Sequence, residues 1–148
     1  MKSIDQLLQE EALALKAAIV FRKAERTLKT QESKAFKEYQ ITPTQFSVLE
    51  TLYSKGNLRI QDLIDKMLAT SGNMTVVLKN MVRDGWIFKI CDPNDRRSFL
   101  VGLTPLGRQK IEEILPRHIQ NISQLMAVLE PDEQEELIRI CKKFKKLS

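Results

Sequence analysis

A chain of 148 residues that is 43% hydrophobic and 6% aromatic is long enough for one domain with an aliphatic, helical core, with or without an added dimerisation element. Its net charge of +5 favours an anionic partner without identifying one. Two distant cysteines exclude a disulfide framework or a zinc motif, the N-terminus is too charged for a signal peptide, and no apolar run reaches the ~20 residues of a membrane span, so we expect a cytoplasmic protein.

The first expected element is a long helix from about residue 4 to residue 39, a stretch without Pro or Gly that is rich in Ala, Leu, Lys and Glu. Its apolar side chains recur at helical spacing, at Ile4, Leu7, Leu8, Leu15, Ala18 and Ile19. A helix of about 30 residues is roughly 45 Å long, which is more than a small domain needs. We expect a second chain to cover the stripe; packing within one chain is the alternative.

The next stretch predicts two short helices. Thr42 and Pro43 have the residue types of a helix cap and a first helical position, and that helix is expected to end at a turn around Gly56. A brief strand over residues 58–60 and a helix to about Met67 follow. Residues 68–70 then form a tight joint into another helix, and two helices joined in this way are typical of a helix-turn-helix.

The helix after the joint is expected to begin at a Thr70-Ser71 cap and to end at Gly85. Helical spacing predicts a buried face made of Met74, Val77, Leu78, Met81 and Val82. The opposite face carries Gly72, Asn73, Thr75, Val76, Lys79, Asn80 and Arg83. That face is small, has hydrogen-bonding groups and cations, and has no acid, as a helix entering the DNA major groove requires.

A hairpin is predicted after Gly85. A strand over residues 86–91 leads into the turn signal of residues 92–95, and the return strand is expected to direct Phe99, Val101 and Leu103 inward. Arg96 and Arg97 lie at the tip, where they suit a minor groove or a pair of phosphates. The predicted fold is therefore mainly α with a small β-hairpin wing, a winged helix-turn-helix flanked by long helices.

Two more helices are expected at the C-terminal end. Thr104 and Pro105 begin the first, which Pro116 should kink. The last begins at Glu130-Pro131, with acidic residues in its first turns and lysines in its last, as the helix dipole favours. The lysines over residues 142–146 suit a solvated helix end, or alternatively a nucleic-acid-binding tail.

These residues resemble the MarR family. Asp95-Arg96-Arg97, followed by Leu103-Thr104 and Gly107, is similar to the wing signature of that family, Asp-x-Arg and then Leu-Thr-x-x-Gly. Residues 42–46 resemble the entry to its second helix, and residues 71–87 resemble its recognition helix. The specific match covers about residues 41–107.

The resemblance implies one MarR-like domain over residues 1–148, with dimerisation helices over 1–39 and 104–148 and a DNA-binding lobe over 41–103. It implies a homodimer on pseudo-palindromic duplex DNA, usually a repressor, released by a small-molecule effector or by oxidation. Arg97 would contact the minor groove, and Asp95 would hold the wing through hydrogen bonds.

The candidate DNA-contacting residues are Arg59, Gln61, Thr70, Ser71, Gly72, Asn73, Thr75, Val76, Lys79, Arg83, Arg96 and Arg97. No catalytic, metal or cofactor residues are predicted, since the chain has one histidine, His118, and no glycine-rich phosphate loop. His118 is expected on a helix surface or in a ligand cleft. No motif identifies the residues of an effector site.

Alternative functions remain open at the level of sequence. A winged helix used only for protein or RNA contacts would lack duplex DNA specificity. A redox-responsive regulator would use Cys91 or Cys141, although packing is the default expectation for both. The reactive cysteine of the family's oxidation-sensing branch lies near the start of the chain, and no cysteine precedes Cys91 here. An enzyme is the least favoured reading.

Overall fold

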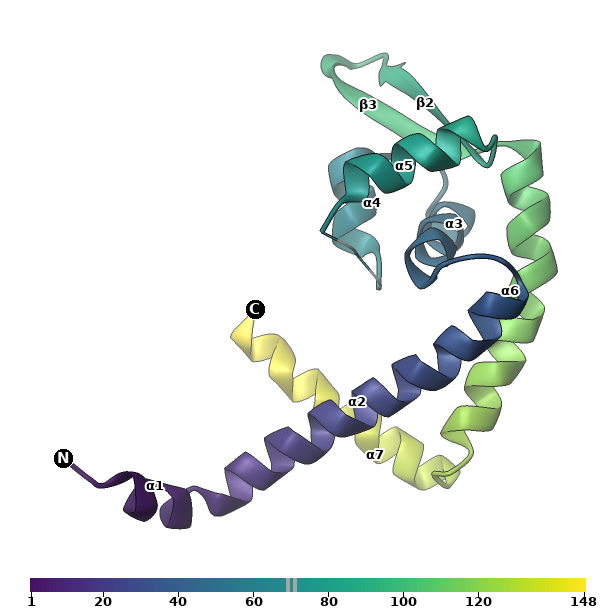
Figure 1. The fold of residues 1–148 in the computed structure, drawn as a ribbon. Coiled ribbons are helices and arrows are strands. Elements are labelled where there is room, and N and C mark those ends of the chain that lie inside the picture. The colour runs from purple at the N-terminus through teal and green to yellow at the C-terminus, as the bar shows by residue number, and fades with distance from the viewer. Residues whose placement is uncertain (69, 71) are drawn as a thin grey trace.

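The computed structural model describes residues 1–68, 70 and 72–148. Over these residues the elements are α1 (Ile4–Glu10), α2 (Ala12–Glu38), α3 (Pro43–Lys55), β1 (Leu58–Arg59), α4 (Ile60–Lys66), α5 (Met74–Arg83), β2 (Ile87–Asp92), β3 (Asp95–Leu103), α6 (Pro105–Met126), α7 (Pro131–Lys142) and a 3₁₀ helix, η1 (Lys143–Leu147). Figure 1 shows a lobe made of α3, α4, α5 and the β-hairpin, with α6 leaving the lobe and α1 and α2 forming an arm that extends away from it.

The N-terminal arm differs from the single helix predicted for residues 4–39. The helix is interrupted at Glu11, whose backbone angles (φ −102°, ψ 13°) are not helical, and it resumes at Ala12. Helix α2 packs against α6, and the C-terminal η1 reaches α2, where the rings of Phe21 and Phe144 stack with centroids 5.9 Å apart. The prediction that residues 4–39 are helical is therefore correct, but they form two helices instead of one.

Local signals fix the starts of α3, α6 and α7 as predicted. The Thr42 hydroxyl accepts a hydrogen bond from the Gln45 backbone N–H, and the Gln45 side chain accepts one from the Thr42 N–H, so Pro43 begins α3 inside a complete capping box. The Thr104 hydroxyl accepts the Gly107 N–H at the start of α6, and Glu130 precedes α7. Helix α6 continues through Pro116 as one element.

Helix α5 begins later than predicted. Ser71, half of the expected cap, and Ala69 in the joint lie outside the described residues, and α5 starts at Met74 after a turn at Gly72 and Asn73. Both turn residues have low helix propensity, and Asn73 adopts a non-helical φ of −130°.

The C-terminal end of α5 is as predicted. Gly85 has a φ of +80°, its N–H donates to the Val82 carbonyl, and the Trp86 N–H donates to the Met81 carbonyl, each over 3.0 Å. A glycine in this left-handed conformation satisfies the last carbonyls of a helix without a steric penalty.

The sheet has the strand order β1-β3-β2, with both pairs antiparallel. Strand β3 is central, and Val101 pairs with both Leu58 and Lys89. Val101 is fully buried and Leu103 half-buried, as predicted, but Phe99 is 41% exposed. The hairpin extends beyond the lobe (Figure 1). Phe99 pairs with Cys91 near its turn, and the Lys89 ammonium lies over the Phe99 ring at 4.4 Å.

The core lies where α3, α5, the sheet and the first half of α6 meet. Its most buried side chains include Val48, Leu49, Leu63, Met81, Ile87, Val101, Ile111 and Ile114. Val82, predicted to be buried, is 38% exposed because it lies at the edge of the α5 apolar face. None of the described helices is both long and apolar enough to cross a membrane.

Candidate DNA-binding surface

Helix α5 buries one face in the core and exposes the opposite, outer face. Met74, Leu78 and Met81 recur every three to four residues and are buried in the core. The opposite side of α5 is therefore exposed at Thr75, Val76, Lys79 and Arg83, with Asn80 half-buried, and Gly72 and Asn73 in the turn before α5 are exposed as well. This surface offers hydroxyl and amide groups for base edges, a valine side chain for a thymine methyl group, and cations for phosphates.

The wing is held by hydrogen bonds within its turn. The Asp95 carboxylate accepts hydrogen bonds from the Arg97 backbone N–H (3.0 Å) and the Ser98 hydroxyl (3.1 Å). Asp95 precedes Arg96 and Ser98 follows Arg97, so these bonds fix the backbone on both sides of the two arginines. The side chains of Arg96 and Arg97 are both exposed. The turn therefore presents two guanidinium groups to solvent at the tip of the hairpin.

Arg59 contacts the turn end of the wing, where β2 ends at Asp92. Its Nε donates to the Asp92 carboxylate over 2.8 Å, and the same carboxylate accepts the Asn94 backbone N–H over 2.9 Å. The Asn94 hydrogen bond and then the Arg59 guanidinium lower the pKa of Asp92, whose side chain is 4% exposed. Sequence reasoning placed Arg59 only at the DNA and missed this ion pair across 33 residues of chain.

A recess of about 440 Å³ lies between α4 and the wing. It brings together three of the predicted DNA-contacting residues, Arg59, Gln61 and Arg97, with Phe99 and Asp62 also in its lining. The Gln61 amide donates to the Asp65 carboxylate on the next turn of α4 over 3.0 Å. Two guanidinium-bearing residues thus border one concavity at the side of the wing.

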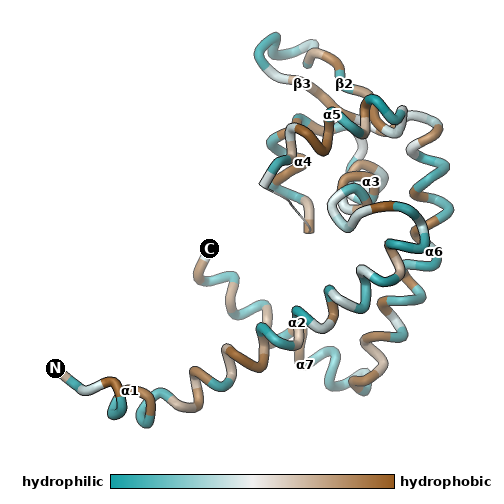
Figure 2. Tube along the Cα trace, in the orientation of Figure 1, coloured by the Kyte–Doolittle hydropathy of each residue, from teal (hydrophilic) through white to brown (hydrophobic). Residues whose placement is uncertain are grey.

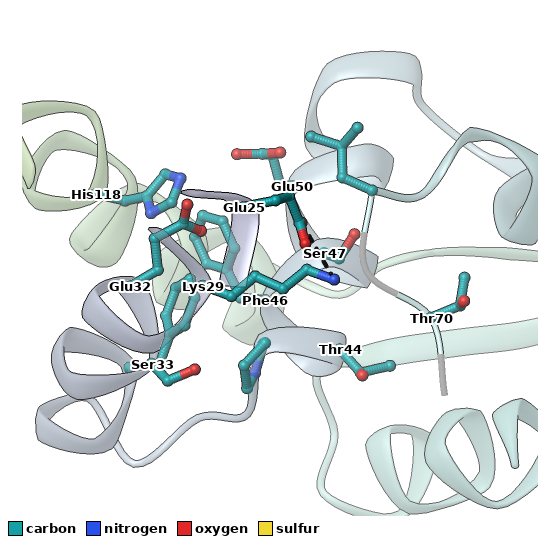
Figure 3. A pocket seen from close by; sticks show the side chains of 13 residues that line it. Glu25, Lys29, Glu32, Ser33, Thr44, Phe46, Ser47, Glu50, Thr70 and His118 are labelled. Atoms are coloured by element: carbon teal, nitrogen blue, oxygen red, sulfur yellow. Dashed lines mark ion pairs between the residues drawn. The ribbon is translucent and has the colours of Figure 1, made fainter. Parts of the chain in front are cut away.

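A larger cavity, of about 590 Å³, lies on the other side of the lobe. Residues from α2, α3, α6 and the joint before α5 border it (Figure 3): Glu25, Lys29, Glu32, Ser33, Phe36, Pro43, Thr44, Phe46, Ser47, Glu50, Leu68, Thr70 and His118. Thr70, predicted to contact DNA, therefore lies outside α5 and beside this cavity.

His118 belongs to the aromatic part of this cavity. Its ring centroid lies 5.5 Å from that of Phe36 and 4.5 Å from that of Phe46, and burial lowers its pKa. The sequence allowed His118 to lie on a helix surface or in a ligand cleft, and in the structure it lines the cavity. Sequence reasoning missed the rest of the cavity, although Glu25, Lys29, Glu32 and Phe36 recur at the spacing of one helical face.

The two cysteines have different environments. Cys91 is exposed on β2, so the expectation that it packs in the interior was wrong, because the wing strand has no core beneath it at this position. Cys141 on α7 is half-buried. Among the described residues, no group of three or more His, Cys, Asp or Glu side chains is arranged to hold a metal ion.

Comparison with known proteins matches residues 41–99 to the model of the MarR family. The chain is 34% identical to the HTH-type transcriptional regulator YkoM of Bacillus subtilis over 91% of this chain and 88% of that protein. It is 32% identical to the HTH-type transcriptional regulator MhqR of the same organism, over 82% and 84%. Its fold is similar to that of a MarR-like transcription regulator from Bacillus cereus, with a TM-score of 0.82, 26% identity, and 91% and 97% of the two chains covered.

Proposed function

The chain belongs to the MarR family of DNA-binding transcriptional regulators, and on this basis we propose that it is a homodimeric repressor of pseudo-palindromic duplex DNA that a small molecule releases. The observation that best supports DNA binding is the exposed outer face of α5, which has no acidic residue and lies beside a wing with two exposed arginines. Because chromosomal DNA is the proposed partner, the cytoplasm is the proposed location. No catalytic step is proposed, since the relatives are named as regulators.

The N-terminal arm supports the dimer. Ile4 is 76% exposed, Leu8 52% and Ile19 50%, and these positions share the apolar stripe of α1 and α2. Figure 2 shows brown, hydrophobic segments along this arm, outside the lobe. A stripe of this length is stabilised when a second copy covers it. Residues 1–39 and 104–148 are thus the proposed dimerisation region, and residues 41–103 the proposed DNA-binding lobe.

The proposed contacts divide by chemistry. Asn73, just before α5, and Thr75 and Val76 on α5 would contact base edges, whereas Lys79 and Arg83 would contact phosphates. Arg97 would enter the minor groove, with Arg96 near the backbone. Two-fold symmetry would separate the half-sites by about one helical turn, 10–10.5 base pairs.

A salt titration tests this assignment. We expect Lys79→Ala to weaken binding to a selected operator and to a scrambled duplex alike, and to reduce the slope of log affinity against log salt by about one, because one phosphate contact is lost. Asn73→Ala should instead weaken the operator complex selectively, by roughly fivefold to 100-fold, because base contacts carry the sequence preference. Fluorescence anisotropy with labelled duplexes measures both effects.

Lys145→Ala is the matched control, because it removes the same charge from the C-terminal lysine cluster, which lies in η1 and not on α5. An unchanged slope for Lys79→Ala together with a reduced slope for Lys145→Ala would assign DNA binding to the C-terminal tail and contradict the proposal. Equal losses on both duplexes for Asn73→Ala would remove the proposed base contact.

A further inference from the structure

The cavity beside α2 has the dimensions and position of an effector site. A volume of about 590 Å³ lies within the range of drug-sized ligand sites. Its walls come from the dimerisation helices α2 and α6 and from α3 in the lobe, and Leu68 and Thr70 border it just before α5. An occupant would therefore contact both the arm and the segment that leads into the DNA-binding helix.

The residues that line this cavity carry a net negative charge, although the whole chain has a net charge of +5. Glu25, Glu32 and Glu50 border the cavity, and Lys29 is the cation beside them in its described lining. The Lys29 ammonium lies 3.2 Å from the Glu25 carboxylate (dashed line in Figure 3), so it is already engaged. Within the described part of the chain, neither Glu32 nor Glu50 has a cation within 4.0 Å in an ion pair.

The two remaining carboxylates interact unfavourably with their surroundings. Burial, followed by repulsion from Glu25 and Glu50, raises the pKa of Glu32 against a smaller attraction from Lys29, and burial raises the pKa of Glu50. Each shift means that the surroundings disfavour the negative charge. A cation bound between them would reverse this, because an opposite charge at short range stabilises the ionised carboxylate.

The aromatic side of the cavity suits the same kind of ligand. Phe36, Phe46 and His118 form one cluster of rings, and burial keeps the imidazole neutral at pH 7 by lowering its pKa. The cluster therefore adds no positive charge, and the faces of the phenyl rings attract cations. A bare metal ion fits poorly, since the described residues contain no group of three or more His, Cys, Asp or Glu side chains that could hold one.

We propose that this cavity binds an organic cation, an amine or quaternary ammonium carrying an aromatic group, with Glu32 and Glu50 as its counter-charges and the Phe36–Phe46 cluster against its apolar body. The cation is the effector insofar as the proposed repressor function holds. Aromatic carboxylates, which would face two carboxylates and one engaged lysine, are rejected by the same arrangement.

Three probes with the same two-ring body test the charge preference: naphthalen-1-ylmethylammonium, naphthalen-1-ylmethanol and 1-naphthoate. Isothermal titration calorimetry of the full chain at pH 7 should give the ammonium a Kd at least about tenfold lower than that of either other probe. Glu32→Gln and Glu50→Gln should each weaken ammonium binding by about threefold to tenfold, and should leave the alcohol unaffected within about twofold. Glu113→Gln, an exposed carboxylate on another face of α6, is the matched control and should change neither.

Equal affinities for the three probes, tighter binding of the naphthoate, or no binding of any probe at about 1 mM would overturn the inference. Weakening by Glu113→Gln equal to that by Glu32→Gln would also overturn it, by showing a general surface-charge effect. Operator binding, measured in parallel by anisotropy without probe, reports separately on the proposed function. If the protein bound the ammonium selectively but did not bind DNA, the proposed cation site would stand and the proposed repressor function would be wrong.

Discussion

Asp92 shows how one side chain can connect the wing to the lobe. Its carboxylate is 4% exposed and receives both the Asn94 N–H and the Arg59 Nε. The second of these bonds joins β1, which belongs to the helix-turn-helix, to the end of β2. A charge-assisted bond at this position restricts how the hairpin can swing relative to α4 and α5.

Asp92→Asn should therefore lower the Tm at pH 7 and weaken operator binding. The pKa of Asp92 is lowered in the folded state, so its contribution to stability is fully present above the ordinary value of 3.8 and is lost as the pH falls through the folded-state value. The Tm difference between wild type and variant should consequently shrink below about pH 4. Thermal melts from pH 3 to pH 7 measure it.

Asp62→Asn serves as the control for Asp92→Asn, because Asp62 is an exposed carboxylate on the neighbouring α4. A Tm difference for Asp92→Asn that stays constant down to pH 3 would show that its ionised carboxylate contributes nothing to stability.

The contact between elements is tightest where α6 begins. The Thr104 hydroxyl donates to the Gly85 carbonyl and accepts the Gly107 N–H, so one residue joins the end of α5 to the start of α6. Gly107 lies directly against this junction, and a Cβ atom there would be 1.9 Å from the Trp86 carbonyl oxygen. Because that oxygen belongs to the backbone, it cannot move aside as a side chain could.

Gly107→Ala should destabilise the fold by about 3 kcal/mol or more, since the helix has to move away from Trp86. Gly72→Ala is the matched control: a Cβ at Gly72 meets nothing within 4 Å, and the expected change is below about 1 kcal/mol. Urea unfolding at one fixed protein concentration compares them, because the stability of a dimer depends on concentration. Equal stability of the two variants would mean that α6 is not clamped at this point.

At the scale of the whole molecule, the arm formed by α1 and α2 has an apolar surface that the single chain leaves uncovered. The apolar stripe of α1 and α2 has a share of exposed leucine and isoleucine that a monomer rarely tolerates. The two DNA-contacting surfaces of the proposed dimer depend on this arm, since it would set the distance between the two copies of α5.

Ile19→Glu should convert the dimer into monomers at about 10 μM and lower operator affinity by about 100-fold or more, because a buried charge disrupts the stripe and one copy has half of the DNA contacts. Light scattering coupled to size exclusion gives the mass. Ala24→Glu, an exposed position on another face of α2, introduces the same charge and should leave the dimer intact. A dimeric Ile19→Glu variant would place the interface elsewhere.

The sequence by itself determined the features whose causes lie within a few residues. The Thr42 cap with Pro43 after it, the left-handed Gly85 and the Thr104–Pro105 start were predicted correctly, because a helix end depends on groups three or four positions away. The late start of α5 was missed because two weak helix formers, Gly72 and Asn73, outweighed the cap signal before them.

Only the tertiary structure decided the features that join distant segments. The Arg59–Asp92 ion pair spans 33 residues, the large cavity draws on four separate segments, and Phe99 is exposed because the hairpin extends past the core. Side-chain periodicity tells which residues share a face of one element, but which other element meets that face depends on how all of them pack.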